Sequence, residues 1–146
     1  MKFTKISIAL FYILSFNVMA GNICSNESTI FYAKTANQKK EVSICEGSET
    51  VTYFFAKADR TQETGELTLT LDKSMVQADR MHGAGYHVDE ISIPNGDVTY
   101  AISTGNGADG QFSDLTVNKS GKQIASIKLD EKSMINNIEE YWIKNN

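Results

Sequence analysis

Apolar and polar residues alternate in short runs along most of the chain. Glu66–Leu71 shows the pattern most clearly, with leucines at 67, 69 and 71 and threonines between them. A period of two predicts strands that bury one face. Eight such runs are expected to be strands: Thr29–Thr35, Glu41–Cys45, Thr50–Ala56, Glu66–Leu71, Tyr86–Ile93, Asp97–Thr104, Phe112–Val117 and Lys122–Leu129. Turn signals recur about every 8–12 residues, which favours one mainly β domain, an antiparallel sandwich or barrel.

Two turn signals fix where hairpins should lie. Pro94-Asn95-Gly96-Asp97 separates two alternating runs, and an Asn-Gly pair there predicts a type I′ turn. Asn118-Lys119-Ser120-Gly121 predicts a second hairpin in the same way. The stretches 57–65, 73–85 and 105–111 are the least patterned, and we expect them to be loops.

The hydrophobic period changes near the C-terminus. Asp130 is typical of a helix N-cap, and Glu131 follows in the first turn. One helical stripe then carries Met134, Ile135, Ile138, Tyr141 and Trp142. The pattern predicts a helix over 131–143 that packs against the sheet, with Trp142 as an anchor.

Residues 1–20 have the features of a signal peptide. Lys2 and Lys5 are followed by the apolar stretch Ile6–Leu14, and Val18-Met19-Ala20 offers small residues to signal peptidase. Cleavage after Ala20 predicts a periplasmic or secreted domain of residues 21–146. The alternative is an N-terminal membrane anchor, for which the apolar run is short.

Composition and charge exclude some classes of function. Hydrophobic residues make up 41% and charged residues 22% of the 146 residues, as in one soluble globular domain. The net charge is −4, and removal of residues 1–20 takes away two lysines, which makes it −6. An acidic chain does not bind a phosphate backbone, so nucleic acid is excluded as a partner. The same charge would steer the domain toward a basic protein.

Cys24 and Cys45 are the only cysteines of the chain. Two cysteines in an exported protein usually form one disulfide. A hairpin that turns at 36–39 would place Cys45 opposite residue 30, so the chain before Ser28 would have to fold back over the sheet. A catalytic thiol is not expected, because neither cysteine has a neighbouring His or a CxxC partner in sequence.

The sequence predicts neither a catalytic site nor a metal site, and no cofactor is expected. His82 and His87 are five residues apart across two glycines, so they do not form a helical ligand pair. A triad of Ser92, His87 and Asp89 fails because alternate strand residues point to opposite faces. Three acids, Asp89, Glu90 and Asp109, do not by themselves indicate a glycosidase. We therefore expect a protein that is not an enzyme.

Binding is the function class that remains. Glycine-containing loops on a β-scaffold commonly carry recognition residues. The expected partner-binding residues are those that commonly anchor interfaces: Arg80, Met81, His82, Tyr86, His87 and Asp109. The alternative is that Tyr86 and Val88 face the core and that Arg80 is solvated.

Two stretches carry a resemblance to a family of small exported proteobacterial proteins, largely uncharacterised. Thr29–Cys45 followed by Val51–Lys57 resembles their opening pattern, TLFS-C-T-NGK-ISLC then YxFGK. Asn118–Ile127 resembles their later V-NGK-IA-L hairpin. Ala33 and Asp130 stand where that family's pattern implies further cysteines, so the resemblance implies a single disulfide here.

The domain plan is also similar to that of periplasmic lysozyme inhibitors, which are small exported β-barrels. Immunity proteins against peptidoglycan-degrading toxins resemble the chain in size and expected compartment. Gly83-Ala84-Gly85-Tyr86 is similar to the inhibitors' SGARY segment, with Gly in place of the Arg and without their W-KG-EA sequel. The resemblance implies inhibition of a lysozyme or a peptidoglycan-hydrolysing toxin by occlusion of its cleft. Arg80, His82 and His87 are the basic side chains that this chain offers for such a loop, and its net charge favours a basic hydrolase as the partner. The alternative is an envelope protein that binds peptidoglycan, lipid or a small molecule in a groove lined by Tyr53, Phe55, Tyr86 and Tyr100.

Overall fold

The computed structural model describes residue 24 and residues 27–58 and 66–146. The signal peptide predicted for residues 1–20 therefore lies outside the described residues. Within the described part, no helix is long and apolar enough to cross a membrane.

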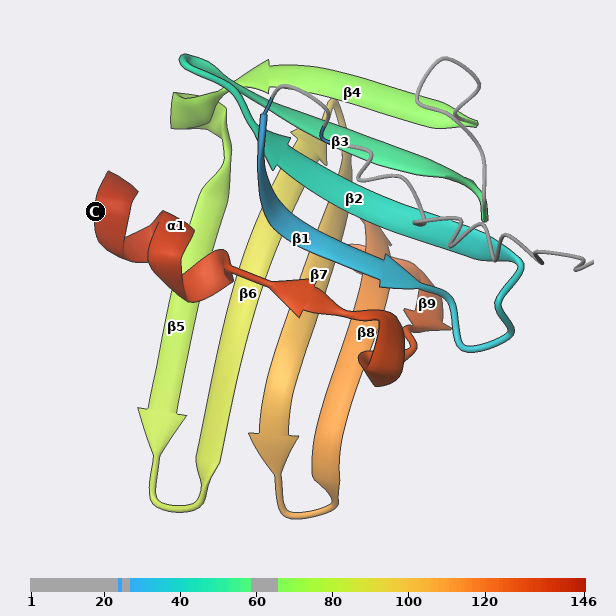
Figure 1. Cartoon of the computed structure of the whole chain (residues 1–146), viewed down its shortest axis with the longest axis vertical. Coiled ribbons are helices and arrows are strands. Elements are labelled where there is room, and N and C mark those ends of the chain that lie inside the picture. Colours follow the sequence, from blue (N-terminus) through green and yellow to red (C-terminus); the bar gives the residue numbers. More distant parts are fainter. Residues whose placement is uncertain (1–23, 25–26, 59–65) are drawn as a thin grey trace, which may run out of the picture.

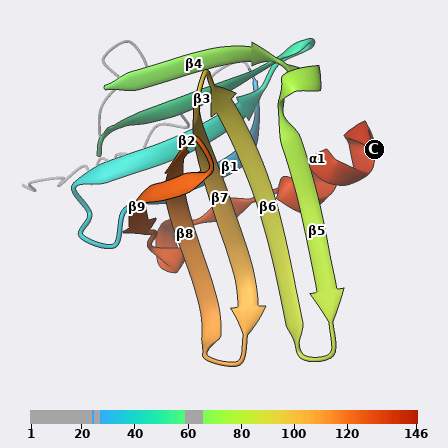
Figure 2. The same cartoon turned by 180° about the vertical axis from the view of Figure 1, so that it is seen from behind.

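Ten strands form two antiparallel sheets of five (Figures 1 and 2). The first sheet has the order β10-β1-β2-β3-β4, and the second has the order β5-β6-β7-β8-β9. The strands are β1 Ser28–Lys34, β2 Lys40–Glu46, β3 Thr50–Lys57, β4 Leu67–Asp72, β5 Gln77–Gly83, β6 Tyr86–Asn95, β7 Val98–Gly107, β8 Gly110–Lys119, β9 Lys122–Lys128 and β10 Ile135–Asn136. The expected mainly β, antiparallel fold is confirmed, and each of the eight expected strands is present.

The hydrophobic core lies between the two sheets. Alternate residues of β2 and β3, such as Ile44 and Tyr53, meet Ile91 of β6 and Ile102 of β7. The ring of Tyr53 stacks on Tyr100 with centroids 5.1 Å apart. Burial of these side chains is the main force that holds the sheets together.

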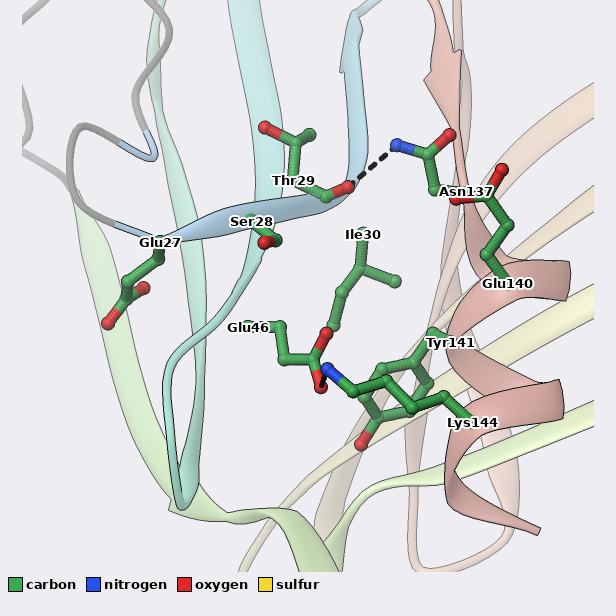
Figure 3. A pocket seen from close by; sticks show the side chains of 9 residues that line it. All are labelled: Glu27, Ser28, Thr29, Ile30, Glu46, Asn137, Glu140, Tyr141 and Lys144. Atoms are coloured by element: carbon green, nitrogen blue, oxygen red, sulfur yellow. Dashed lines mark hydrogen bonds and ion pairs between the residues drawn. The ribbon is translucent and has the colours of Figure 1, made fainter.

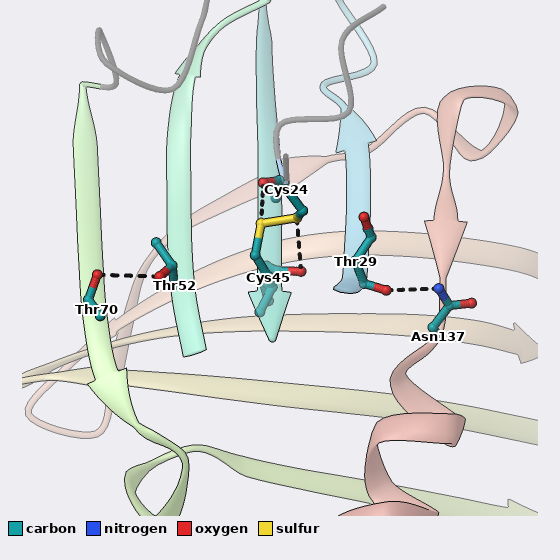
Figure 4. The surroundings of a disulfide bond; sticks show 8 residues. Cys24, Thr29, Cys45, Thr52, Thr70 and Asn137 are labelled. Carbon is teal, nitrogen blue, oxygen red and sulfur yellow. Dashed lines mark hydrogen bonds between the residues drawn. A yellow bond between two sulfur atoms is a disulfide. The ribbon is translucent and has the colours of Figure 1, made fainter. Parts of the chain in front are cut away.

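A β-bulge in β1 places the disulfide. Thr29 pairs with Cys45 while Phe31 pairs with Ile44, so Ile30 is the extra residue and both Ile30 and Phe31 are buried. Cys45 thus lies opposite residue 29 instead of the expected residue 30. Cys24 is bonded to Cys45 across a Cα–Cα distance of 5.5 Å (Figure 4), which confirms the pairing. A structural disulfide indicates a non-reducing compartment.

The segment predicted as a loop over 73–85 contains β5. Only Ala78 of this strand is buried, and most of its other residues are polar, so no apolar alternation marks it. The segment 105–111 is also mostly strand, because β7 runs to Gly107 and β8 begins at Gly110. The prediction of a loop over 73–85 was wrong, and within 105–111 only Ala108-Asp109 form a tight turn, since hairpin pairing, not burial, makes the other residues extended.

The C-terminal helix is shorter than predicted. A 3-10 turn over Glu131–Ser133 comes first, with the Asp130 side chain accepting a hydrogen bond from the Lys132 amide. Strand β10 follows and pairs with β1. The α-helix α1 covers only Ile138–Asn145. The predicted C-terminal helix is present, but its predicted start at 131 was wrong, because residues 135–136 pair with the free edge of β1 instead.

The hairpin turns also differ in type. Asn95 pairs with Val98, so the β6–β7 turn is Gly96-Asp97, with a positive φ at Gly96 only. This is the pattern of a type II′ turn, not of the predicted type I′. The β8–β9 turn, Ser120-Gly121, has positive φ at both residues, as type I′ requires.

Candidate binding surface on the projecting hairpins

The β5–β6 and β7–β8 hairpins extend well beyond the first sheet (Figure 1). We call inner the face of the second sheet that carries Ile91 and Ile102 into the core, and outer the opposite face. The strand register places Arg80 opposite Asp89 and His82 opposite His87, all on the inner face. Met81, Tyr86 and Val88 alternate with them and lie on the outer face.

A chain of polar contacts runs along the inner face of the β5–β6 hairpin. The two histidines meet through their Nδ1 atoms, 3.1 Å apart. His87 Nε2 lies 2.9 Å from Asp89 Oδ2, and Arg80 Nε donates to Asp89 Oδ1 at 3.0 Å. Arg80 Nη1 lies 2.8 Å from Glu139 Oε1 on α1. We call His82, His87, Asp89, Arg80 and Glu139 the hairpin network.

Asp89 is the buried centre of this network. It is only 2% exposed, and a carboxylate at such a position needs partners for both oxygens. Arg80 and His87 supply one partner each. The Arg80 side chain is itself only 13% exposed, and its guanidinium lies 5.8 Å from the centre of the Trp142 ring. These contacts tie the edge strand β5 to α1 and fix the direction of the hairpin.

The tip of the β5–β6 hairpin exposes apolar side chains. Met81 is 49% and Tyr86 47% exposed. The ring of Tyr86 lies across the strand pair on Gly83, where a Cβ would come within 1.9 Å of Cε1. Glycine at position 83 therefore lets the tyrosine ring lie flat on the hairpin.

The predicted partner-binding residues fall into three places. Arg80, His82 and His87 come together in the hairpin network, and Met81 and Tyr86 lie on the outer face. Asp109 is exposed at the turn between β7 and β8.

The sequence did not predict that Asp89 and Glu139 hold this surface together. Trp142 was predicted as an anchor of the helix, but its contact with Arg80 was not. The available signal was the symmetric placement of residues 80, 82, 87 and 89 about a two-residue turn. Ser92 lies on the outer face, away from His87 and Asp89. Glu90 also lies outward and accepts a hydrogen bond from Ser103.

Two open cavities flank the C-terminal segment. One of about 380 Å³ lies beside the hairpin network and is lined by His87, Thr104, Gly105, Asn106, Gln111, Phe112, Glu131, Met134 and Asn136. The other, of about 490 Å³, is lined by Glu27, Ser28, Thr29, Ile30, Glu46, Asn137, Glu140, Tyr141 and Lys144 (Figure 3).

The groove that we expected Tyr53, Phe55, Tyr86 and Tyr100 to line is not formed by them. Tyr53 and Tyr100 are stacked in the core, and Tyr86 lies at the hairpin tip.

Glu46 is the charged centre of the larger cavity. Its Oε1 accepts hydrogen bonds from Lys73 at 2.8 Å and from Lys144 at 2.9 Å. Desolvation raises the pKa of Glu46, but the hydrogen bonds and charges of the two lysines outweigh it, so the pKa lies below its ordinary value. Burial, and then the charge of Glu46, raise the pKa of Tyr141.

Among the residues that the structure describes, no group of three or more His, Cys, Asp or Glu side chains is arranged to hold a metal ion. No protein-family model matches the chain, and searches of curated proteins and of solved structures returned no match.

Proposed function

We propose that this chain is an exported, non-enzymatic protein that inhibits a lysozyme or a peptidoglycan-hydrolysing toxin by inserting the β5–β6 hairpin into its cleft. The observation that carries the proposal is the exposed tip of that hairpin, with Met81 and Tyr86 on a strand pair that projects past the sandwich. Exposed aromatic and methionine side chains on a rigid element are typical binding anchors.

The compartment of this function is the periplasm or the medium. The disulfide requires a non-reducing environment. The predicted signal peptide would direct export and would then be removed by cleavage after Ala20. Peptidoglycan hydrolases act in this compartment, so an inhibitor exported by a bacterium would encounter them there.

Preorganisation supports insertion. A hairpin held by the hairpin network loses little conformational freedom when a partner closes around it. Arg80, with 13% of its side chain exposed, serves in this proposal as the support of the hairpin. Met81, His82 and Tyr86 are then the residues that contact the cleft, while the net charge of −6 after cleavage steers a basic enzyme toward the domain.

The test begins with the mature chain, residues 21–146, as bait in a pull-down from envelope and medium, read by mass spectrometry. Any peptidoglycan hydrolase recovered at near-stoichiometric level is then purified and assayed for inhibition. We expect the double variant Met81→Ser, Tyr86→Ala to weaken inhibition by about 30-fold, as for the loss of an anchor.

A matched control is Ile124→Ser. Ile124 is 59% exposed on β9, at the opposite edge of the second sheet. This variant should inhibit as the unchanged chain does. Equal inhibition by the double variant would show that another surface binds the enzyme, and absence of inhibition would reject the proposal.

A second candidate function is ligand binding in the envelope, favoured by the cavity of about 490 Å³. Its size is within the range of small-molecule sites, and most of its lining residues are polar. Soluble peptidoglycan fragments should then perturb the NMR signals of residues around Glu46 and Tyr141. Perturbation confined to the β5–β6 tip, or none, would contradict this candidate.

A further inference from the structure

We propose that His82 and His87 form a two-histidine site for a divalent transition metal, of the Cu²⁺ or Zn²⁺ class. This inference does not depend on the proposed inhibitor function. The spacing of five residues, which rules out a helical pair, places the two side chains directly opposite one another across a hairpin turn. Both lie on the inner face, and both present Nδ1 to the other.

The distance between the two nitrogens fits coordination of one ion. Metal–imidazole bonds are about 2.0–2.1 Å long, so two such nitrogens lie about 2.9 Å apart at a right angle and about 3.3 Å apart at the tetrahedral angle. The observed separation of 3.1 Å falls between these values. A metal ion can therefore bind both Nδ1 atoms with little movement of the hairpin.

The orientation of the rings agrees with this geometry. Their centroids are 4.7 Å apart and their planes are inclined by 44°. A linear N–H···N bond of the same length would separate the centroids by about 5.4 Å. The two rings are tilted toward each other, as are the rings of two histidines that bind one metal ion.

Asp89 prepares His87 as a ligand. Its carboxylate lies 2.9 Å from His87 Nε2 and accepts that N–H, which leaves the lone pair on Nδ1. Carboxylate–histidine–metal chains of this kind orient metal ligands in many proteins. When the ion binds, the proton of His82 Nδ1 moves to the other nitrogen of that ring.

The charge behind the pair favours a cation. Asp89 and Glu139 carry two negative charges, and Arg80 carries one positive charge, so this part of the hairpin network has a net charge of −1. Imidazole ligands suit copper and zinc, and affinity follows the order in which Cu²⁺ exceeds Zn²⁺. Water fills the remaining coordination positions.

The chain has only these two histidines, so no other imidazole can bind the added ion in the test. The mature chain, residues 21–146, is prepared without a histidine tag and titrated with Cu²⁺ and with Zn²⁺ by calorimetry. We expect the unchanged chain to bind one ion. Its affinity should be about 100-fold higher than that of the His82→Asn variant, because the variant keeps only one of the two histidine ligands. The control Gln111→Ala, on the same inner face, should bind as the unchanged chain does.

NMR of the two imidazoles gives the second readout. Stoichiometric Zn²⁺ should shift the signals of both rings, and circular dichroism should show that the His82→Asn variant keeps its sheet. Copper that binds only at the new N-terminal amine would be held equally by His82→Asn. Equal affinity of the two chains, or imidazole signals unchanged by Zn²⁺, would overturn the proposal.

Discussion

Arg80 and Asp89 face each other across the β5–β6 strand pair, with Nε and Oδ1 3.0 Å apart. The pair lies where the hairpin leaves the sandwich, and Arg80 continues to Glu139 of α1. The direction of the hairpin tip thus depends on an ion pair at its base.

Replacement of Arg80 by alanine should destabilise the domain. Asp89 would keep His87 as a partner but would lose the charge that compensates its burial, which costs about 3 kcal/mol for a buried pair. Urea unfolding followed by circular dichroism measures the change. Lys128→Ala breaks the pair of an exposed lysine with Asp114 and should change stability by about 1 kcal/mol or less. Similar small losses in both variants would mean that Asp89 is not the centre we describe.

The disulfide should contribute about 3 kcal/mol, because it closes a loop between cysteines 21 residues apart. The variant Cys24→Ala, Cys45→Ala is expected to melt at a lower temperature than the oxidised chain. A reducing agent should lower the melting temperature of the unchanged chain and leave that of the variant alone. If the reducing agent also lowers the melting temperature of the variant, loss of the disulfide is not the cause of the change.

Acid should weaken the domain through Glu46. The pKa of Glu46 is lower in the folded state than its ordinary value of 4.5. The stability that the Glu46 carboxylate adds to the folded domain is therefore complete above pH 4.5 and is lost as the pH falls through the folded pKa. Stability of the unchanged chain should therefore decline from about pH 5 toward pH 3. Glu46→Gln should lose stability at neutral pH and show a shallower decline. Parallel pH profiles of the two chains would contradict this role.

Two glycines of the hairpins should differ in their tolerance of alanine. A Cβ at Gly105 would lie 1.9 Å from the carbonyl oxygen of His87, so the backbone must move. The three atoms nearest to a Cβ at Gly83 all belong to the ring of Tyr86, which can swing away. We expect Gly105→Ala to lose more than about 2 kcal/mol and Gly83→Ala less than about 1 kcal/mol. Chemical unfolding of both variants checks the order, and a reversed order would contradict the described register.

Local patterns were sufficient for several elements. The leucines at 67, 69 and 71 identify β4 because period-two burial is visible in the residues themselves. Turn residues located the β6–β7 and β8–β9 hairpins, although the β6–β7 turn type depended on which residues pair. The pairing of Cys24 with Cys45 followed from cysteine count and the expected compartment.

Other features depend on partners distant in sequence. β5 is extended because it pairs with β6, and its polar residues carry no periodic signal. Ile135 and Asn136 pair with β1, more than 100 residues earlier in the chain, which ends the helical pattern predicted there. Propensity is a weak preference that such edge pairing overrides.

The sequence by itself determined eight of the ten described strands, the positions of the β6–β7 and β8–β9 hairpins and the disulfide, because alternation, turn chemistry and cysteine pairing are local or compositional properties. Only the tertiary structure decided that His82, His87, Asp89 and Arg80 form one network and that Met81 and Tyr86 lie on the opposite face. The reason is register: a shift of one residue reverses the face of every side chain on a strand. That register follows from a two-residue turn and from packing against α1, neither of which the strand's own residues specify.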